Sequence, residues 1–159
     1  SVSPGNETLE EWEKSIKQNL FSATNMIQFA IPFLKKTQGC IVCISSICGI
    51  ESIPDAPLTY SSSKAALNCF VKGISRPLGK YGVRVNAIAP GNILFEGSSW
   101  QKKIYEDSDS VFSMIKKEVP LESFGNSDDI ANLVSYLSSP ISNFITGSVF
   151  TIDGGQIRS

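Results

Sequence analysis

The stretch Cys40-Ile41-Val42-Cys43-Ile44-Ser45-Ser46-Ile47-Cys48-Gly49 decides the fold of this chain. Residues 40–44 are continuously apolar, which is typical of a strand buried on both faces of a parallel sheet. Two serines and a glycine follow, at the end of the strand where open α/β sheets place their ligand sites. The Ser46 hydroxyl can donate a hydrogen bond there to a carbonyl oxygen that is gaining negative charge. For Ser45 or Ser46 alone, a residue that merely ends the strand is an equally good interpretation.

Downstream, a tyrosine and a lysine stand four residues apart in Tyr60-Ser61-Ser62-Ser63-Lys64. On a helix, positions i and i+4 lie on the same face, so the phenol and the ammonium can point into one site. A free tyrosine titrates near pH ~10. A cation about 4 Å away supplies ~4 kcal/mol at an effective dielectric of ~20 but only ~1 kcal/mol in bulk water, so Lys64 is expected to activate Tyr60 only in a partly dried cleft. By itself the pair is also compatible with a solvated helix turn.

Two further apolar segments, at 82–91 and 147–155, complete a pattern of strands separated by helices. The first ends in Pro90-Gly91, residues that break a strand ladder and allow close approach of another backbone. Helices are expected from about Leu9 to Leu34 and at 59–81, because apolar residues recur there at steps of three and four. This order predicts the α/β class, with part of a doubly wound, Rossmann-like parallel sheet.

Caps and prolines predict where the helices begin and end. Thr8, which two acidic residues follow closely, suits the N-terminal turn of the leading helix. Pro32 is expected to kink or shorten that helix near its end, and Pro77 to interrupt the 59–81 helix. Two shorter helices are predicted further on, at 111–119 and, capped by Ser127-Asp128-Asp129, at 127–137.

The segment 97–109 is polar with a few aromatic residues. It is interpreted either as a mobile flap over a substrate or as a simple surface loop. The aromatic side chains of Phe95, Trp100 and Tyr105 hint at the apolar wall of a pocket.

Four motifs resemble those of the short-chain dehydrogenase/reductase family, close to its 3-oxoacyl-(acyl-carrier-protein) reductase branch. They are Ile44-Ser45-Ser46-Ile47-Cys48-Gly49, Tyr60-Ser61-Ser62-Ser63-Lys64-Ala65-Ala66-Leu67, Val85-Asn86-Ala87-Ile88-Ala89-Pro90-Gly91, and Thr146-Gly147 with Asp153-Gly154-Gly155. They follow the family order and spacing, and four linked motifs are far more specific than one. The resemblance implies an oxidoreductase that transfers a hydride between NAD(P)(H) and the carbon of a small carbonyl or alcohol substrate.

The resemblance also implies catalytic roles. Tyr60 is similar to the general acid/base that exchanges a proton with the substrate oxygen. Lys64 resembles the residue that lowers the tyrosine pKa and binds the nicotinamide ribose. Ser46 matches the serine that orients the substrate oxygen, which makes Ser45 the less favoured candidate. Asn19 resembles the helix asparagine that holds a water in the proton relay, although without that context it reads as a polar residue within a helix.

Other positions resemble the cofactor-binding backbone. Pro90, Gly91 and Ile93 match residues that lie against the nicotinamide, together with Tyr60 and Lys64. A departure from the family pattern stands two residues later. Phe95 replaces a threonine that usually contacts the nicotinamide carboxamide or phosphates.

The glycine-rich phosphate loop of the family is not found. None of the twelve glycines forms Gly-x-x-x-Gly-x-Gly or Gly-x-Gly-x-x-Gly. In the family the first of these opens the chain and holds the pyrophosphate at a helix N-terminus. We therefore expect a sheet that lacks the N-terminal dinucleotide-binding strands, with the chain starting near the fourth helix of the family fold.

Two functions therefore stay open. The chain is either an oxidoreductase of this family, or a truncated or non-catalytic module that cannot hold the cofactor alone and acts within a larger chain or an oligomer. Without the preceding strands, one edge of the 40–44 strand would be open, and an open edge is a template for association. In the family, the helices that match those around Leu9 and Tyr60 also form the main dimer interface, so a homo-oligomer is expected.

The composition fits one domain spanning 1–159. The chain is 42% hydrophobic with a net charge of −1, and its basic residues are scattered, so no nucleic-acid partner is expected. No apolar run approaches the ~20 residues that span a membrane. The four cysteines (Cys40, Cys43, Cys48 and Cys69) are expected to be free thiols, which indicates a reducing, cytoplasmic compartment. Without a histidine in the chain, no metal site is expected.

Overall fold

The computed structural model describes residues 5–158 and alternates helices with strands. The helices are α1 (Leu9–Ile16), α2 (Ser22–Thr37), α3 (Leu58–Gly79), α4 (Ser99–Glu106), α5 (Ser108–Glu118) and α6 (Ser127–Ser138). The strands are β1 (Cys40–Ile44), β2 (Arg84–Pro90) and β3 (Val149–Ile152). Short turns complete the order: the π-helical turn η1 (Lys17–Phe21) and the 3-10 turns η2 (Ile47–Gly49) and η3 (Pro140–Ser142).

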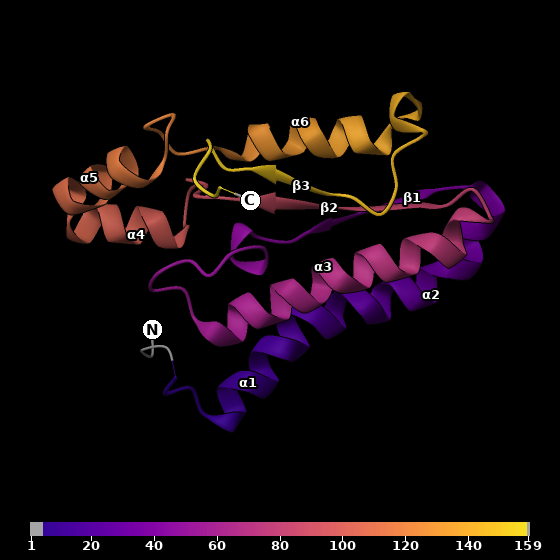
Figure 1. Ribbon diagram of the computed structural model, residues 1–159, viewed down its shortest axis with the longest axis horizontal. Helices are drawn as coiled ribbons and strands as arrows, with labels where there is room; N and C mark the ends of the chain where they lie inside the picture. Colours follow the sequence, from indigo (N-terminus) through magenta and orange to yellow (C-terminus); the bar gives the residue numbers. More distant parts are fainter. Residues whose placement is uncertain (1–4, 159) are drawn as a thin grey trace.

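In the described part of the chain, the strands form one parallel sheet in the order β1-β2-β3. Cys40 lies opposite Arg84 at the start of the β1-β2 pair, and Pro90 lies opposite Ile152 at the end of the β2-β3 pair. The carboxyl ends of the strands therefore meet at one edge of the sheet, towards α4 and α5 (Figure 1). The predicted fold class, a partial doubly wound sheet, is confirmed, and β1 is an edge strand within residues 5–158.

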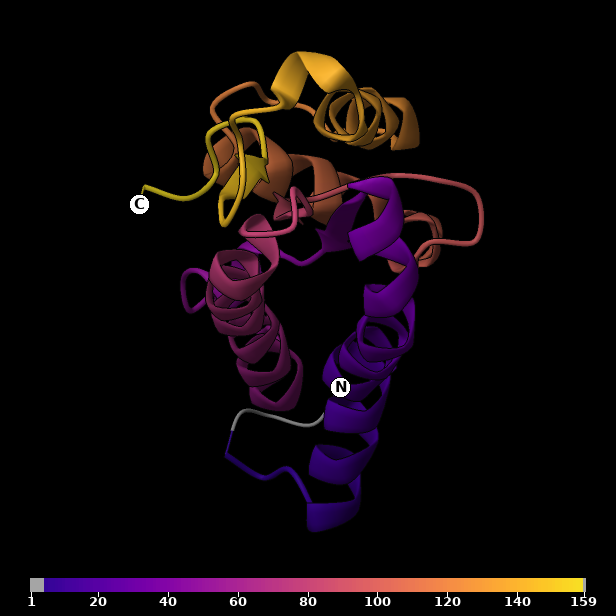
Figure 2. The same cartoon turned by 90° about the vertical axis from the view of Figure 1, so that its right-hand side faces the viewer.

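Helices cover both faces of the sheet. Figure 1 shows α6 on one face and α3 with α2 on the other, which gives three layers. Figure 2 shows α3 beside the long arm formed by α1, η1 and α2. This layering explains why Val85 to Ala89 of β2 are buried and mostly apolar, since a central parallel strand is covered on both faces.

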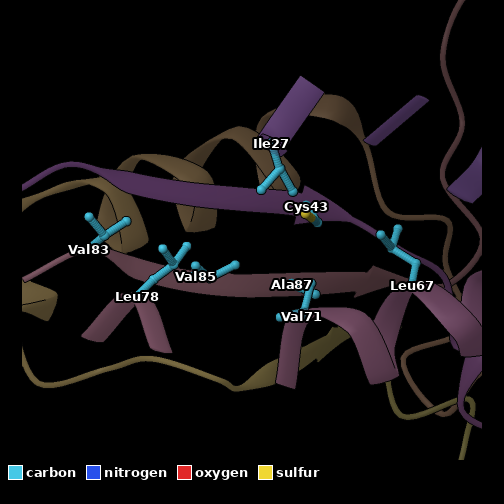
Figure 3. Close-up of a cluster of buried hydrophobic side chains, with 8 residues drawn as sticks. All are labelled: Ile27, Cys43, Leu67, Val71, Leu78, Val83, Val85 and Ala87. Carbon is cyan, nitrogen blue, oxygen red and sulfur yellow. The ribbon is translucent and has the colours of Figure 1, made fainter. Parts of the chain in front are cut away.

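The core lies between β1, β2 and the helices α2 and α3 (Figure 3). Its members are Ile27, Cys43, Leu67, Val71, Leu78, Val83, Val85 and Ala87. Within residues 5–158, no helix is long and apolar enough to cross a membrane.

The leading helix differs from the single long helix that the periodicity predicts. Thr8 caps it as expected, with Glu11 completing a reciprocal capping box. The π-helical turn η1, which contains Asn19, then separates α1 from α2. The Ser22 hydroxyl donates to the Gln18 carbonyl at 2.6 Å, and Asn19 Nδ2 donates to the Ser15 carbonyl at 3.1 Å. Such side-chain bonds to backbone carbonyls compete with the regular helix ladder, and single π turns occur often at functional sites.

Pro32 does not shorten its helix, and the predicted interruption at Pro77 is wrong. α2 continues for five residues beyond Pro32 and ends at Thr37, and α3 runs unbroken through Pro77 to Gly79. At each proline the missing N–H removes one helical hydrogen bond, but the turns before and after it keep the helix continuous.

The interpretation of 97–109 as a loop is also wrong, because α4 occupies most of it. The Ser98 hydroxyl accepts from the Gln101 amide at 3.1 Å and so caps the helix. The Trp100 ring packs on the Phe124 ring at 5.4 Å between centroids. α6 begins as predicted at Ser127, although its capping residue is Asn126.

Candidate active site

The serine-rich turn lies where β1 ends. The Ser45 amide donates to the Ile88 carbonyl at 2.6 Å, which ties the turn to β2. Ser46 then leaves the sheet in an extended conformation, and its Oγ accepts from the Cys48 amide at 3.2 Å. The Ser46 side chain is therefore fixed by the cap that it makes to η2.

Tyr60 and Lys64 occupy the first two turns of α3, which begins close to this edge of the sheet. Lys64 Nζ lies 5.6 Å from the centroid of the Tyr60 ring and donates to the Ile44 carbonyl at 2.9 Å. The Ser46 side chain lies close enough to the Tyr60 phenol to lower its pKa. The structure thus brings Ser46, Tyr60 and Lys64 together, as the sequence predicted.

Gly49 makes this approach possible. A Cβ at this position would lie 2.6 Å from the Lys64 carbonyl carbon and 2.9 Å from the Ala65 amide nitrogen. These atoms belong to the helix backbone and cannot turn aside as a flexible side chain could. Only glycine lets η2 press directly onto α3 at the level of Lys64.

The electrostatics differ from the prediction that Lys64 lowers the tyrosine pKa. Burial raises the pKa of the Tyr60 phenol above 10.0, and the nearby Ser46 side chain only partly opposes this rise. Burial also lowers the pKa of the Lys64 ammonium below 10.5, and the nearby Cys43 side chain only partly opposes this fall. The low dielectric of a buried site strengthens the attraction between two charged groups. It also disfavours the charged form of each group. The ammonium is moreover engaged with the Ile44 carbonyl, so in this structure burial decides the phenol pKa.

Asn19 reaches α3 through two serines. Its Nδ2 is 3.3 Å from Ser15 Oγ, and Ser15 Oγ is 3.2 Å from Ser63 Oγ. Ser63, which precedes Lys64 in the chain, donates to the Thr59 carbonyl at 2.7 Å. The sequence analysis did not find Ser15 or Ser63, although Ser15 stands four residues before Asn19 and one turn of helix brings such residues together.

The predicted cofactor-side residues lie just beyond β2. Gly91 continues the sheet by donating its amide to the Ile152 carbonyl at 3.0 Å. Ile93 forms a parallel bridge with Gly125 that uses the Asn92 carbonyl and the Leu94 amide. In a parallel bridge this leaves the Ile93 N–H and C=O pointing away from Gly125.

The aromatic residues near the edge do not form one wall. Trp100 and Phe112 both pack on Phe124, with centroids 5.4 and 6.1 Å apart. Phe95 and Tyr105 are exposed instead. The idea that Phe95, Trp100 and Tyr105 line a common pocket is therefore not supported by their positions.

Comparisons with known proteins agree with this geometry. A family model described as "Enoyl-(Acyl carrier protein) reductase" matches residues 4–156. A 3-oxoacyl-(acyl-carrier-protein) reductase from Chlamydia muridarum is 37% identical over 148 residues, covering 92% of this chain and 57% of the relative. The isoepoxydon dehydrogenase patN of Penicillium expansum is 33% identical over 147 residues, covering 92% of this chain and 56% of the relative.

The chain belongs to the short-chain dehydrogenase/reductase family. Among solved family structures, a 4-hydroxyisoleucine dehydrogenase in complex with NADH superposes with a TM-score of 0.84 and 31% identity, over 98% of this chain and 64% of that one. A 3-oxoacyl-(acyl-carrier protein) reductase from Brucella melitensis gives a TM-score of 0.88 and 27% identity, over 98% and 57% of the two chains. Family members thus use NAD(P)(H), and this chain spans somewhat more than half the length of the curated relatives it matches.

The described residues fit the nicotinamide end of such a cofactor. The N–H and C=O of Ile93 point away from Gly125, which is its bridge partner. One donor and one acceptor placed side by side can pair with the oxygen and the amino group of a carboxamide. Lys64 reaches the same edge of the sheet, because its ammonium lies at the end of β1.

Proposed function

We propose that this chain carries the proton-transfer site of an NAD(P)(H)-dependent oxidoreductase that interconverts a carbonyl and an alcohol. The observation that supports the proposal most is the convergence of Ser46, Tyr60 and Lys64. These side chains come from a strand end and from a helix, and the serine acts on the phenol while the ammonium lies 5.6 Å from the ring centroid.

In the proposed reaction Tyr60 is the general acid/base. During reduction its O–H donates the proton to the substrate oxygen, and during alcohol oxidation the phenolate takes it back. Ser46 donates a second hydrogen bond to the same oxygen, which stabilises the negative charge that develops there. The bound nicotinamide supplies or accepts the hydride.

Lys64 and Asn19 have supporting roles in this proposal. Lys64 holds the nicotinamide ribose, and its bond to the Ile44 carbonyl fixes the ammonium at the edge of the sheet. Asn19 lies in the π turn and supports the second turn of α3 through Ser15 and Ser63. A water held by Asn19 would continue the proton path to solvent.

Pro90, Gly91 and Ile93 are proposed to lie against the nicotinamide ring. The free peptide groups of Ile93 would hold the carboxamide, which restricts the ring to one orientation. Phe95 stands at the position of a family threonine and supplies no hydroxyl for that contact.

The test is substitution of Tyr60 by phenylalanine, which removes one oxygen and keeps the ring. Loss of a general acid/base typically lowers turnover by roughly 10²–10⁴-fold. In the complete enzyme we therefore expect a fall of this size in NADPH- or NADH-dependent turnover of a β-keto ester such as ethyl acetoacetate. The dissociation constant of the nucleotide, measured by fluorescence, should stay within about threefold, because the ring remains in place. Near-normal turnover would remove Tyr60 from its role.

A second candidate function is association without catalysis. Three large apolar side chains of α2 support it, since Met26, Phe29 and Phe33 are 73%, 79% and 69% exposed and lie three or four residues apart. The sequence also contains no Gly-x-x-x-Gly-x-Gly. An exposed apolar stripe of this kind commonly marks an interaction surface.

Nucleotide titration and sedimentation together separate the two candidates. The association module predicts a homo-oligomer that binds NADPH and NADH only very weakly, and micromolar binding of either nucleotide would contradict it. Phe29→Glu places a charge in the stripe and should dissociate the oligomer, whereas Gln28→Glu adds the same charge at an exposed position of the same helix outside the stripe.

A further inference from the structure

Asn68 continues the row of side chains that Tyr60 and Lys64 begin. The three residues are spaced by four along α3 and therefore lie on one face of the helix. Asn68 is 7% exposed, and its Nδ2 donates to the Gly49 carbonyl at 3.0 Å. One buried side chain thus joins the catalytic helix to the end of η2.

The Gly49 end of η2 is coupled to Ser46 through the turn itself. The Gly49 amide donates to the Ser46 carbonyl at 3.0 Å, and the Cys48 amide donates to Ser46 Oγ at 3.2 Å. Gly49 is also pressed onto the helix, since a Cβ there would strike the Lys64 backbone. A force that holds the Gly49 carbonyl against α3 therefore also fixes the direction of the Ser46 hydroxyl.

The hydrogen bonding of Asn68 is incomplete. Its Oδ1 is buried without a hydrogen-bond partner within residues 5–158. An unpaired buried oxygen is destabilising compared with an apolar side chain of similar size, and a half-satisfied polar group is worse for stability than none. Stability alone therefore does not favour asparagine at this position.

A second buried asparagine provides the contrast. Asn86 in β2 uses both ends of its amide: Nδ2 donates to the Ile145 carbonyl at 2.9 Å, and Oδ1 accepts from the Ser148 amide at 3.1 Å. Asn86 thus links β2 to the segment before β3 by two hydrogen bonds, so its role is structural. Buried polar atoms without a hydrogen-bond partner occur more often at functional sites than elsewhere. Of these two asparagines Asn68 has such an atom, as do Asn92 and Gln156 elsewhere in the described residues.

We infer that Asn68 is a positioning residue that holds the Ser46 turn in register with Tyr60. The inference rests on the proposed function, because it assigns Asn68 to the geometry of that site. Asn68 touches neither the substrate nor the cofactor and acts through Gly49. Removing its donor leaves the Ser46 hydroxyl free to swing away from the phenol.

The experiment compares Asn68→Leu, Asn68→Asp and Asn86→Leu. Both Asn68 variants lose the donor to Gly49, one with an apolar side chain and one with an isosteric acid. Each is measured for melting temperature, for kcat and KM with NADPH and ethyl acetoacetate, and for deuterium exchange of a peptide that covers residues 45–50. A misplacement of about 1 Å in such a site can lower turnover by ~100-fold.

For Asn68→Leu we expect an unchanged or raised melting temperature, about tenfold or more lower kcat with little change in KM for NADPH, and faster exchange in 45–50. The alkaline limb of the pH profile should also move upward, because the Ser46 side chain lowers the phenol pKa. Asn68→Asp should show the same loss of kcat, so a folding failure of one variant leaves the other as the test. Asn86→Leu should lower the melting temperature and leave kcat per folded molecule and the pH profile unchanged.

Wild-type kcat and pH profile in a folded Asn68 variant would overturn the inference, as would unchanged exchange in 45–50. In that case wild-type turnover and its loss in Tyr60→Phe still support the proposed function. Failure of the proposed function shows differently, because Tyr60→Phe would then retain the turnover of the wild type.

Discussion

The two halves of α3 bury different mixtures of side chains. The first half buries mostly polar residues beside the half-buried Tyr60 and Lys64, namely Thr59, Ser63 and Asn68 together with the core residue Leu67. The second half buries Val71 at 0% and Leu78 at 3% exposure in the core, with Ser75 as its one buried polar residue. The same helix thus provides precise polar contacts at one end and stability at the other. Substitutions in the two halves should therefore separate activity from stability.

The largest expected effect is on turnover, from Ser46→Ala beside the first half of α3. Removing one donor to a developing oxyanion typically lowers kcat by about 10²–10³-fold. We expect a loss of this size in steady-state kinetics, with the melting temperature close to that of the wild type. Ser45→Ala is the matched control, because Ser45 Oγ bonds only the Lys64 carbonyl at 3.4 Å. Equal losses of kcat in the two variants would show that Ser46 has no catalytic role that Ser45 lacks.

The next effect is on stability, from Leu78→Ala in the second half. Truncating a buried leucine leaves a cavity and typically costs about 2–5 kcal/mol of unfolding free energy. Urea unfolding should show a loss in this range, while kcat per folded molecule stays unchanged. A folded Leu78→Ala protein with strongly reduced kcat would mean that the core end of α3 also sets the geometry of the site.

The smallest effect is the dependence of stability on alkaline pH. Because burial raises the pKa of Tyr60, the unfolded chain loses this proton at a lower pH than the folded chain. The contribution is fully present below the unfolded pKa near ~10 and is lost as the pH rises through the higher folded pKa. Melting temperatures should thus fall more steeply above pH ~10 for the wild type than for Tyr60→Phe. Cys43 and Lys64 also titrate, but both proteins contain them, so parallel curves would show that Tyr60 is not buried as described.

The sequence predicted the part of the site that one strand end and one helix define. A continuous apolar run followed by Ser45-Ser46 places a hydroxyl at the edge of a parallel sheet, and the spacing of Tyr60 and Lys64 places both on one helix face. These features depend on local periodicity, which the sequence shows directly. The alternation of strands and helices along the chain was also predicted.

Features that depend on tertiary contacts could not be predicted in this way. At the π turn, the side chains of Asn19 and Ser22 bond the carbonyls of Ser15 and Gln18, and in α4 Trp100 packs on Phe124. The pKa of Tyr60 was predicted with the wrong sign, because the prediction counted the charge of Lys64 and underestimated the burial of the phenol. Tertiary packing commonly overrides local propensity in this manner.

The most direct test of the account is a double-mutant comparison of turnover at the Ser46–Tyr60 pair. If the two hydroxyls act on one substrate oxygen as a unit, Ser46→Ala should cost far less in the Tyr60→Phe background than in the wild type, because residues that act together lose their effects non-additively. The account predicts that the double variant is within about threefold of Tyr60→Phe alone. Losses that multiply in full would show that the two residues act independently, and would contradict a single shared proton-transfer site.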